Sequence, residues 1–146
     1  AIGHLAGSIT QGQRSVAVGF DCGSNSQSSF AVAIGGGTGK TNQGEHGIAI
    51  GRSCAVVDQG ALSIAIGRSC GQMYQGSNAI AIGYEAGMTN QGDNSIIING
   101  GTTNLSPTTA DACFVNPIRT VTSNTYVLTY NDTTKEITKM LISSLP

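Results

Sequence analysis

The chain has 146 residues, of which 21 are glycine, 5% are aromatic and none is tryptophan. Seven Lys and Arg residues against eight Asp and Glu residues give a formal net charge of −1, and no basic run is present that would attract a phosphate backbone or an anionic membrane surface. No stretch approaches the roughly 18 apolar residues that span a bilayer. The composition therefore argues against nucleic-acid binding, against membrane insertion and against a conventional core of large side chains.

A short pattern, seen in Ser63–Gly67 as SIAIG, returns every sixteen residues. Its final glycine occurs as Gly3, Gly19, Gly35, Gly51, Gly67 and Gly83. The aliphatic residue at the preceding position occurs as Ile2, Val18, Ile34, Ile50, Ile66, Ile82 and, before Asn99, Ile98. A glutamine keeps the same step as Gln11, Gln27, Gln43, Gln59, Gln75 and Gln91. A short and strict period is typical of a solenoid in which one repeat forms one coil. We predict an all-β fold, a parallel β-roll or β-solenoid of 16-residue coils, over residues 1–101.

The repeated strand, such as Ile64-Ala65-Ile66, alternates large and small residues with a period of two. We expect the β-branched residues to fill the interior of each coil and the alanines to face outward. Alanine recurs at this position as Ala1, Ala17, Ala33, Ala49, Ala65 and Ala81. Because water would tolerate any polar residue there, the uniform alanines favour close approach by another subunit, and we expect an obligate homotrimer. We also expect positive φ angles at the glycines after the glutamines, which are Gly12, Gly44, Gly60, Gly76 and Gly92.

The chain changes character near Gly101, because all glycines lie before this point and all three prolines lie after it. We therefore divide the chain into a repeat domain, 1–101, and a second region, 102–146. In the second region, 102–109 is a polar segment that we expect to be a linker. Two strand-like runs, Tyr126–Tyr130 and Lys135–Lys139, follow with a turn between them and predict a β-hairpin stem. Because residue 1 falls inside a repeat, we also expect further coils upstream in the parent protein.

Two segments, Gly76–Ala86 (GSNAIAIGYEA) and Asp93–Ile96 (DNSI), resemble the head repeats of trimeric autotransporter adhesins of the YadA type. The resemblance covers about two thirds of the chain. It implies a left-handed parallel β-roll, three copies of which pack into an obligate homotrimer used for adhesion.

Two further segments, Phe114–Arg119 (FVNPIR) and Val127–Ile137 (VLTYNDTTKEI), resemble the stem that precedes a self-cleaving intramolecular chaperone in viral and phage fibre proteins. We interpret the chain as a segment of a trimeric viral fibre or spike on the virion surface, attached to a host-surface carbohydrate or other receptor. The alternatives are the head of a bacterial trimeric autotransporter adhesin on the bacterial outer surface, and a purely structural fibre shaft.

Stacking and hydrogen-bonding side chains are the groups that hold a carbohydrate. The candidate ligand-binding residues are Tyr74, Tyr84, Asn42, Asn90, Arg52 and Arg68. Arg52 and Arg68 occupy one repeat position on successive coils, so they require a counter-charge from Asp21, from Glu85 or from a bound anion. The alternative for this pair is two solvated side chains in a groove between subunits.

Other chemistries find little support. The run Gly35–Thr41 looks like a phosphate-binding loop, but that motif needs a glycine where Ile34 stands. No paired carboxylates and no Ser-His-Asp order indicate an enzyme, and we predict no cofactor and no metal site. An ice-binding surface is a further alternative, but the chain lacks the flat rank of threonines that it would need.

Three of the four cysteines, Cys22, Cys54 and Cys70, share one repeat position with alanines. This interchange indicates a small buried side chain. Cys54 and Cys70 are close enough for a disulfide, but stacked side chains point the same way, so we favour free thiols.

Overall fold

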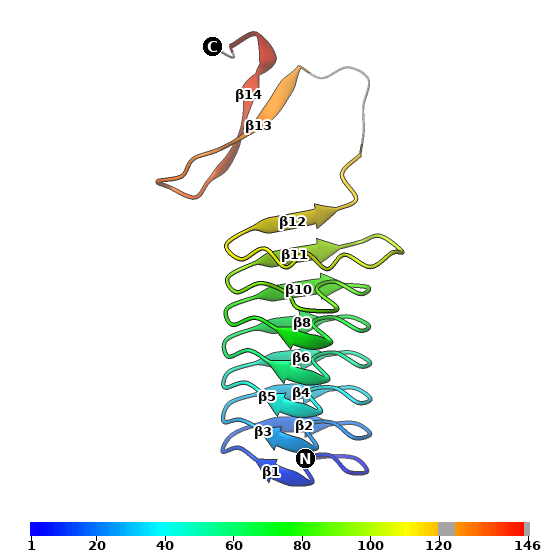
Figure 1. Ribbon diagram of the computed structural model, residues 1–146. Coiled ribbons are helices and arrows are strands. Elements are labelled where there is room, and N and C mark those ends of the chain that lie inside the picture. The colour runs from blue at the N-terminus through cyan, green and yellow to red at the C-terminus, as the bar shows by residue number, and fades with distance from the viewer. Residues whose placement is uncertain (120–124, 145–146) are drawn as a thin grey trace.

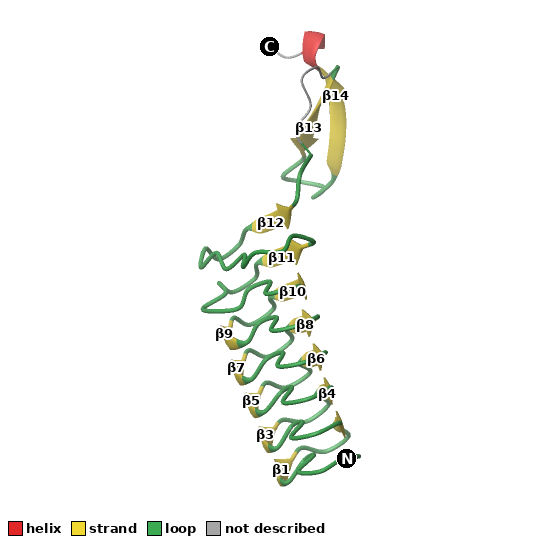
Figure 2. Cartoon of the chain, turned by 90° about the vertical axis from the view of Figure 1, so that its right-hand side faces the viewer, coloured by secondary structure: helices red, strands yellow, loops and turns green. Residues whose placement is uncertain are grey.

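The computed structural model describes residues 1–119 and 125–144. The predicted fold is confirmed: short parallel strands stack in coils of sixteen residues, and an antiparallel hairpin follows (Figure 1). The two sheets of the β-solenoid lie on opposite sides of the roll (Figure 2).

The strands of each coil belong alternately to a seven-stranded and a five-stranded sheet. The seven-stranded sheet contains β2 (Val16–Val18), β4 (Val32–Ile34), β6 (Ile48–Ile50), β8 (Ile64–Ile66), β10 (Ile80–Gly83), β11 (Ile96–Asn99) and β12 (Cys113–Asn116). The five-stranded sheet contains β1 (Ile9–Gln11), β3 (Asn25–Gln27), β5 (Thr41–Gln43), β7 (Val57–Gln59) and β9 (Met73–Gln75). Equivalent residues of successive coils pair directly, as Ala49 does with Ala65.

The roll continues past the boundary expected at Gly101. Strand β12 pairs in parallel with β11, and its Asn116 side chain donates to Asn99, seventeen residues earlier, at 2.9 Å. The segment expected to be a linker supplies part of this last coil, because Leu105 forms a parallel bridge with Ala86. The last coil is one residue longer than the others, because Ile96 pairs with Cys113, seventeen residues later. The parallel pairing therefore reaches Asn116.

The expected orientation of the repeated strand is wrong. The alanines point inward and are fully buried at Ala17, Ala33, Ala49, Ala65 and Ala81. The β-branched residues on either side of them point outward, and Ile34, Ile66 and Ile82 are each more than a third exposed. The uniform alanines thus reflect the inside of the roll and not a subunit contact.

The narrow interior explains this reversal. A methyl group placed on Gly39, in the turn across the coil, would lie 3.0 Å from the Cβ of Ala33. No isoleucine fits in so small a space. In the last two coils the inward residue is larger: Ile97 and then Phe114 replace alanine. These two side chains and Leu105 belong to one hydrophobic cluster, which closes the end of the core.

The glutamines occupy the other side of the interior, where they form a ladder. From Gln27 to Gln91, each amide donates to the carbonyl oxygen of the facing strand, as Gln75 Nε2 does to Ile64 O at 2.9 Å. Most neighbouring glutamines are also joined, for example Gln75 Nε2 to Gln91 Oε1 at 3.1 Å. The ladder therefore ties the two sheets together and also ties each coil to the next.

The glycines after the glutamines have a different role from the one expected. None of them has a positive φ, so that prediction is wrong. A Cβ on Gly60 would instead lie 2.5 Å from the carbonyl carbon of Gly76 in the next coil. Glycine suits this position because the backbones of successive coils touch, although Ser28 occupies it in one coil.

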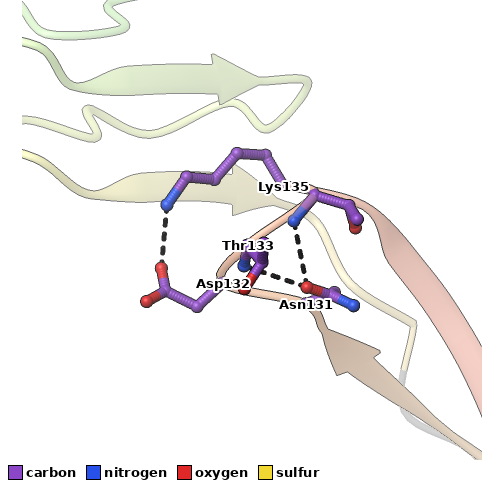
Figure 3. A network of polar contacts seen from close by, with 5 residues as sticks. Asn131, Asp132, Thr133 and Lys135 are labelled. Carbon is purple, nitrogen blue, oxygen red and sulfur yellow. Dashed lines mark hydrogen bonds and ion pairs between the residues drawn. The ribbon is translucent and has the colours of Figure 1, made fainter.

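The hairpin pairs β13 (Tyr126–Tyr130) with β14 (Ile137–Leu141) and is followed by a 3₁₀ turn, Ile142–Ser144. Its tight turn is held by Asn131, whose side-chain oxygen accepts hydrogen bonds from the backbone amides of Thr133 and Thr134 at 2.9 and 3.0 Å (Figure 3). Lys135 pairs with Asp132 at 2.8 Å across the same turn. The hairpin stem predicted from the sequence is confirmed.

Candidate interaction surfaces

The outer face of the seven-stranded sheet is aliphatic along the length of the roll. Its exposed members, each between 36% and 46% exposed, are Val16, Ile34, Ile66, Ile82, Ile96, Ile98 and Val115. The residues between them, such as Ile48 and Ile50, are half-buried. We call this surface the aliphatic face. Large apolar areas on one side of a thin rod are a typical feature of a protein–protein contact.

The outer face of the five-stranded sheet is polar and varies from coil to coil. The middle residue of each strand has a positive φ, between 51° and 60°, at Thr10, Ser26, Asn42, Asp58, Tyr74 and, beyond β9, Asn90. Tyr74 is 55% exposed, and Asn42 Nδ2 donates to Asp58 Oδ1 at 2.7 Å. We call these six residues the polar rank.

The turn after each strand of the seven-stranded sheet carries a third set of residues. Arg52 and Arg68 follow β6 and β8, and their coils are joined by the hydrogen bond from Ser69 N to Arg52 O at 2.9 Å. The guanidinium carbon of Arg68 lies 5.4 Å from the centroid of the Tyr84 ring, one coil further along. We call Arg52, Arg68 and Tyr84 the arginine edge.

The six candidate ligand-binding residues therefore divide into two groups. Asn42, Tyr74 and Asn90 belong to the polar rank, whereas the other three form the arginine edge. The two sheets lie on opposite sides of the roll (Figure 2), so the two groups belong to different parts of its surface. They do not form one pocket on a single chain.

The acidic residues proposed as counter-charges for the arginines are not paired with them. Asp21 Oδ2 pairs with Lys40 Nζ at 2.8 Å, and hydrogen bonds from Lys40 and Ser24 hold the pKa of that carboxyl below its ordinary value. The Glu85 carboxylate raises the pKa of the adjacent Tyr84 phenol. In the part of the chain that the structure describes, the ion pairs are Asp21–Lys40, Glu45–His46 and Asp132–Lys135, so neither arginine is paired with an acid.

All four cysteines are free, as we expected for the three in the roll. Cys22, Cys54 and Cys70 are buried beside the turn that follows the seven-stranded sheet, and Cys113 is exposed in β12. The Cys54 thiol on the adjacent coil and burial raise the pKa of Cys70, and burial raises the pKa of Cys22. The hydrogen bond with Cys70 lowers the pKa of Cys54, but all three thiols are buried and fill space in the core.

Across residues 1–119 and 125–144, no group of three or more His, Cys, Asp or Glu side chains is placed to hold a metal ion. The same ranges contain no helix long and apolar enough to cross a membrane. No protein-family model, curated protein or solved structure matches the chain.

The aliphatic face is the surface that sequence reasoning missed. The signal was present, because valine or isoleucine recurs on both sides of the repeated alanine. We assigned these residues to the interior because large aliphatic side chains are usually buried. The glutamine repeated in every coil was a second signal: its uniformity indicates that it points into the interior, since an exposed polar position varies from coil to coil.

Proposed function

We propose that this chain is a self-assembling segment of a homotrimeric viral fibre, with the aliphatic faces of three copies packed together along the fibre axis. The observation that carries the proposal is the aliphatic face itself, which runs from Val16 in β2 to Val115 in β12 without a charged residue on the strands. Burying exposed apolar surface contributes about 25 cal/mol per Å². A contact that repeats in every coil therefore gains stability with every coil.

A second copy of the chain is the partner that fits this face best. Adjacent strands are about 4.8 Å apart, so the outward valines and isoleucines form ridges with that spacing. A copy that runs in the same direction presents ridges with the same spacing over the full length. With a net charge of −1 on each chain, little electrostatic repulsion opposes such packing.

The hairpin provides a second, independent reason for self-association. Leu128, Tyr130 and Ile137 are each at least 60% exposed. An isolated two-stranded hairpin is marginally stable in water. Hairpins from neighbouring copies would cover these side chains for one another.

The number of copies and the viral origin rest on the resemblances in the sequence, as does the left-handed coil. The head of a bacterial trimeric autotransporter adhesin remains the alternative, and so does a purely structural fibre shaft. All three share the same assembly.

Light scattering on the purified chain tests the assembly. We expect three times the chain mass of 14.8 kDa at micromolar concentrations. A folded monomer at that concentration would contradict self-association, and a dimer would contradict the threefold arrangement.

We propose as the second part of this function that the assembled fibre attaches to a host-surface carbohydrate without altering it. The supporting observation is the polar rank, which lies on the side of the roll away from the aliphatic face and would stay exposed in the assembly. Tyr74 offers a ring for stacking on a sugar, and Asn42 and Asn90 offer amides. Single contacts of this kind bind in the millimolar to micromolar range, about 4 to 8 kcal/mol, and several copies raise the avidity.

Incubation of the labelled assembly with host cells and with a panel of surface glycans tests attachment. We expect binding that falls on Tyr74→Ala but not on Thr10→Ala, which changes the same rank four coils away. No binding to cells or glycans by the intact assembly would leave a structural shaft.

A further inference from the structure

The arginine edge contains two positive charges that no acid pairs with in residues 1–119 and 125–144. Arg52 and Arg68 stand at the same position of adjacent coils, about 4.8 Å apart along the roll. Like charges on directly neighbouring strands destabilise a sheet. The equivalent position elsewhere holds His4, Phe20, Gly36 and Tyr84, so the coil itself does not require a cation there.

Neither acid near this edge is paired with an arginine in the part of the chain that the structure describes. Asp21 pairs with Lys40 at 2.8 Å, and the Glu85 carboxylate raises the pKa of the adjacent Tyr84 phenol. Serines follow both arginines, at Ser53 and Ser69, and both serines are partly exposed with φ of 56°. Between Arg52 and Arg68 the edge thus offers guanidinium groups and hydroxyl donors to a ligand, and the carboxylate of Glu85 stands one coil further along, beside Tyr84.

One of the arginines is also positioned. The Arg68 guanidinium lies over the Tyr84 ring, which restricts its movement at little cost. An arginine fork donates two parallel hydrogen bonds to a carboxylate or a sulfate, so two adjacent forks can hold one anionic group from both sides.

We propose that Arg52 and Arg68 form a binding site for the anionic group of an acidic glycan, either a carboxylate or a sulfate. Tyr84 supports the Arg68 side chain, and Ser53 and Ser69 supply hydroxyl donors. The inference rests on the proposed attachment to carbohydrate and assigns the acidic part of that ligand to a residue pair outside the polar rank.

The test compares three glycans that share one core: lactose, lactose with a terminal sialic acid, and sulfated lactose. Binding to the immobilised assembly is measured at low and at high salt. We expect at least one acidic glycan to bind about tenfold more tightly than lactose, and this preference to decline with salt. The better of the two acidic probes identifies the source of the anion.

The double variant Arg52→Gln/Arg68→Gln removes the site. Its matched control, Arg14→Gln/Lys135→Gln, removes the same net charge from other parts of the chain. We expect only the first variant to lose the tenfold preference, with light scattering unchanged for both. Equal binding of acidic and neutral glycans overturns the anion site but leaves attachment standing, as does a preference that survives in Arg52→Gln/Arg68→Gln. If no glycan binds, the anion site and the attachment proposal fail together, whereas the assembly is judged separately from its mass.

Discussion

The inner and outer faces of the seven-stranded sheet differ clearly in how far their side chains are buried. On the inner side, the alanines from Ala17 to Ala81 are fully buried and identical in five successive coils. On the outer side, valine and isoleucine are almost as uniform, yet many are more than a third exposed. The outer side of the five-stranded sheet is also exposed, but its residues change from one coil to the next.

This contrast separates two causes of uniformity. The inner alanines are uniform because the space between the sheets admits nothing larger. The outer valines and isoleucines meet no such limit within the chain, and water would tolerate the variation seen in the polar rank. Their uniformity therefore indicates a contact that lies outside the single chain, which is the basis of the proposed assembly.

The largest effect is expected from Ala65→Leu, which overfills the inner side. Three additional carbon atoms have no space between the two sheets, so the coils around β8 must separate. Overpacking costs about 3 kcal/mol or more in so tight a site. Urea denaturation followed by circular dichroism should show a lower midpoint or no folded baseline. Ala110→Leu, the same change at an exposed residue, is the control, and equal stability of the two variants would contradict the orientation of the strand.

The outer side is tested by Ile66→Asp. The carboxylate would reach water on a single chain, but Ile66 is only 36% exposed, so the roll itself should lose about 1 to 2 kcal/mol and remain folded. In the assembly the same charge would be buried without a partner, and dissociation to monomers is expected. Light scattering measures the mass, and circular dichroism checks the fold.

Met73→Asp is the matched control for this change, because Met73 and Ile66 are both 36% exposed and lie on opposite sheets. It should keep the assembled mass. If both aspartate variants assemble normally, the aliphatic face is not the contact surface.

Much of the fold follows from the period alone. The sixteen-residue step fixes the coil length, the parallel pairing and the position of each strand, and turn-forming residues such as Asn131 and Asp132 fix the hairpin. Which face of the strand points into the roll could not be predicted, because an alternating Ile-Ala-Ile pattern has the same period whichever side is buried. The interior width decides it, and that width depends on how tightly the turns on both sides close.

The candidate site was less predictable. The sequence placed Arg52 and Arg68 together correctly, since residues sixteen apart stack in a solenoid. It did not show that Tyr74 and Tyr84, only ten residues apart, belong to different parts of the surface. Nor did it show that Asp21 is paired with Lys40, because that contact joins different repeat positions on successive coils.

The interior of the roll can also be destabilised by a substitution that keeps the size of the side chain. Gln75→Leu removes an amide that donates to Ile64 O at 2.9 Å and accepts from Gln59 Nε2 at 3.2 Å. The partners stay buried and lose these bonds, so we expect a loss of about 2 to 3 kcal/mol in the free energy of unfolding. Gln13→Leu, at an exposed glutamine, should cost little by the same denaturation experiment. A loss no greater for Gln75→Leu than for Gln13→Leu would mean that the ladder does not stabilise the roll.

The smallest effect is expected where the ladder is broken. Gln59 Oε1 is buried without a hydrogen-bond partner, whereas the equivalent oxygens of Gln27, Gln43, Gln75 and Gln91 each accept from the preceding glutamine. The break coincides with Ala55, which stands where the other coils have glycine; at Gly39 and Gly71 an added Cβ would lie 2.7 Å from the side-chain oxygen of the glutamine four residues later. The Ala55 methyl group therefore excludes Gln59 Oε1 from the position that the other glutamine oxygens occupy in the ladder.

Ala55→Gly should therefore let Gln59 return to the ladder and stabilise the roll. The backbone favours the change, because Ala55 has a φ of 46°, in the left-handed region that glycine adopts without strain. We expect a gain of about 1 kcal/mol, combining one restored hydrogen bond with relief of the left-handed backbone. Ser69→Gly is the control, because Ser69 has a similar φ of 56° and tests the relief of the backbone alone. Equal gains from both substitutions in urea denaturation would show that the ladder is not restored. A loss at Ala55 would show that its buried methyl group contributes more to the core than the restored hydrogen bond.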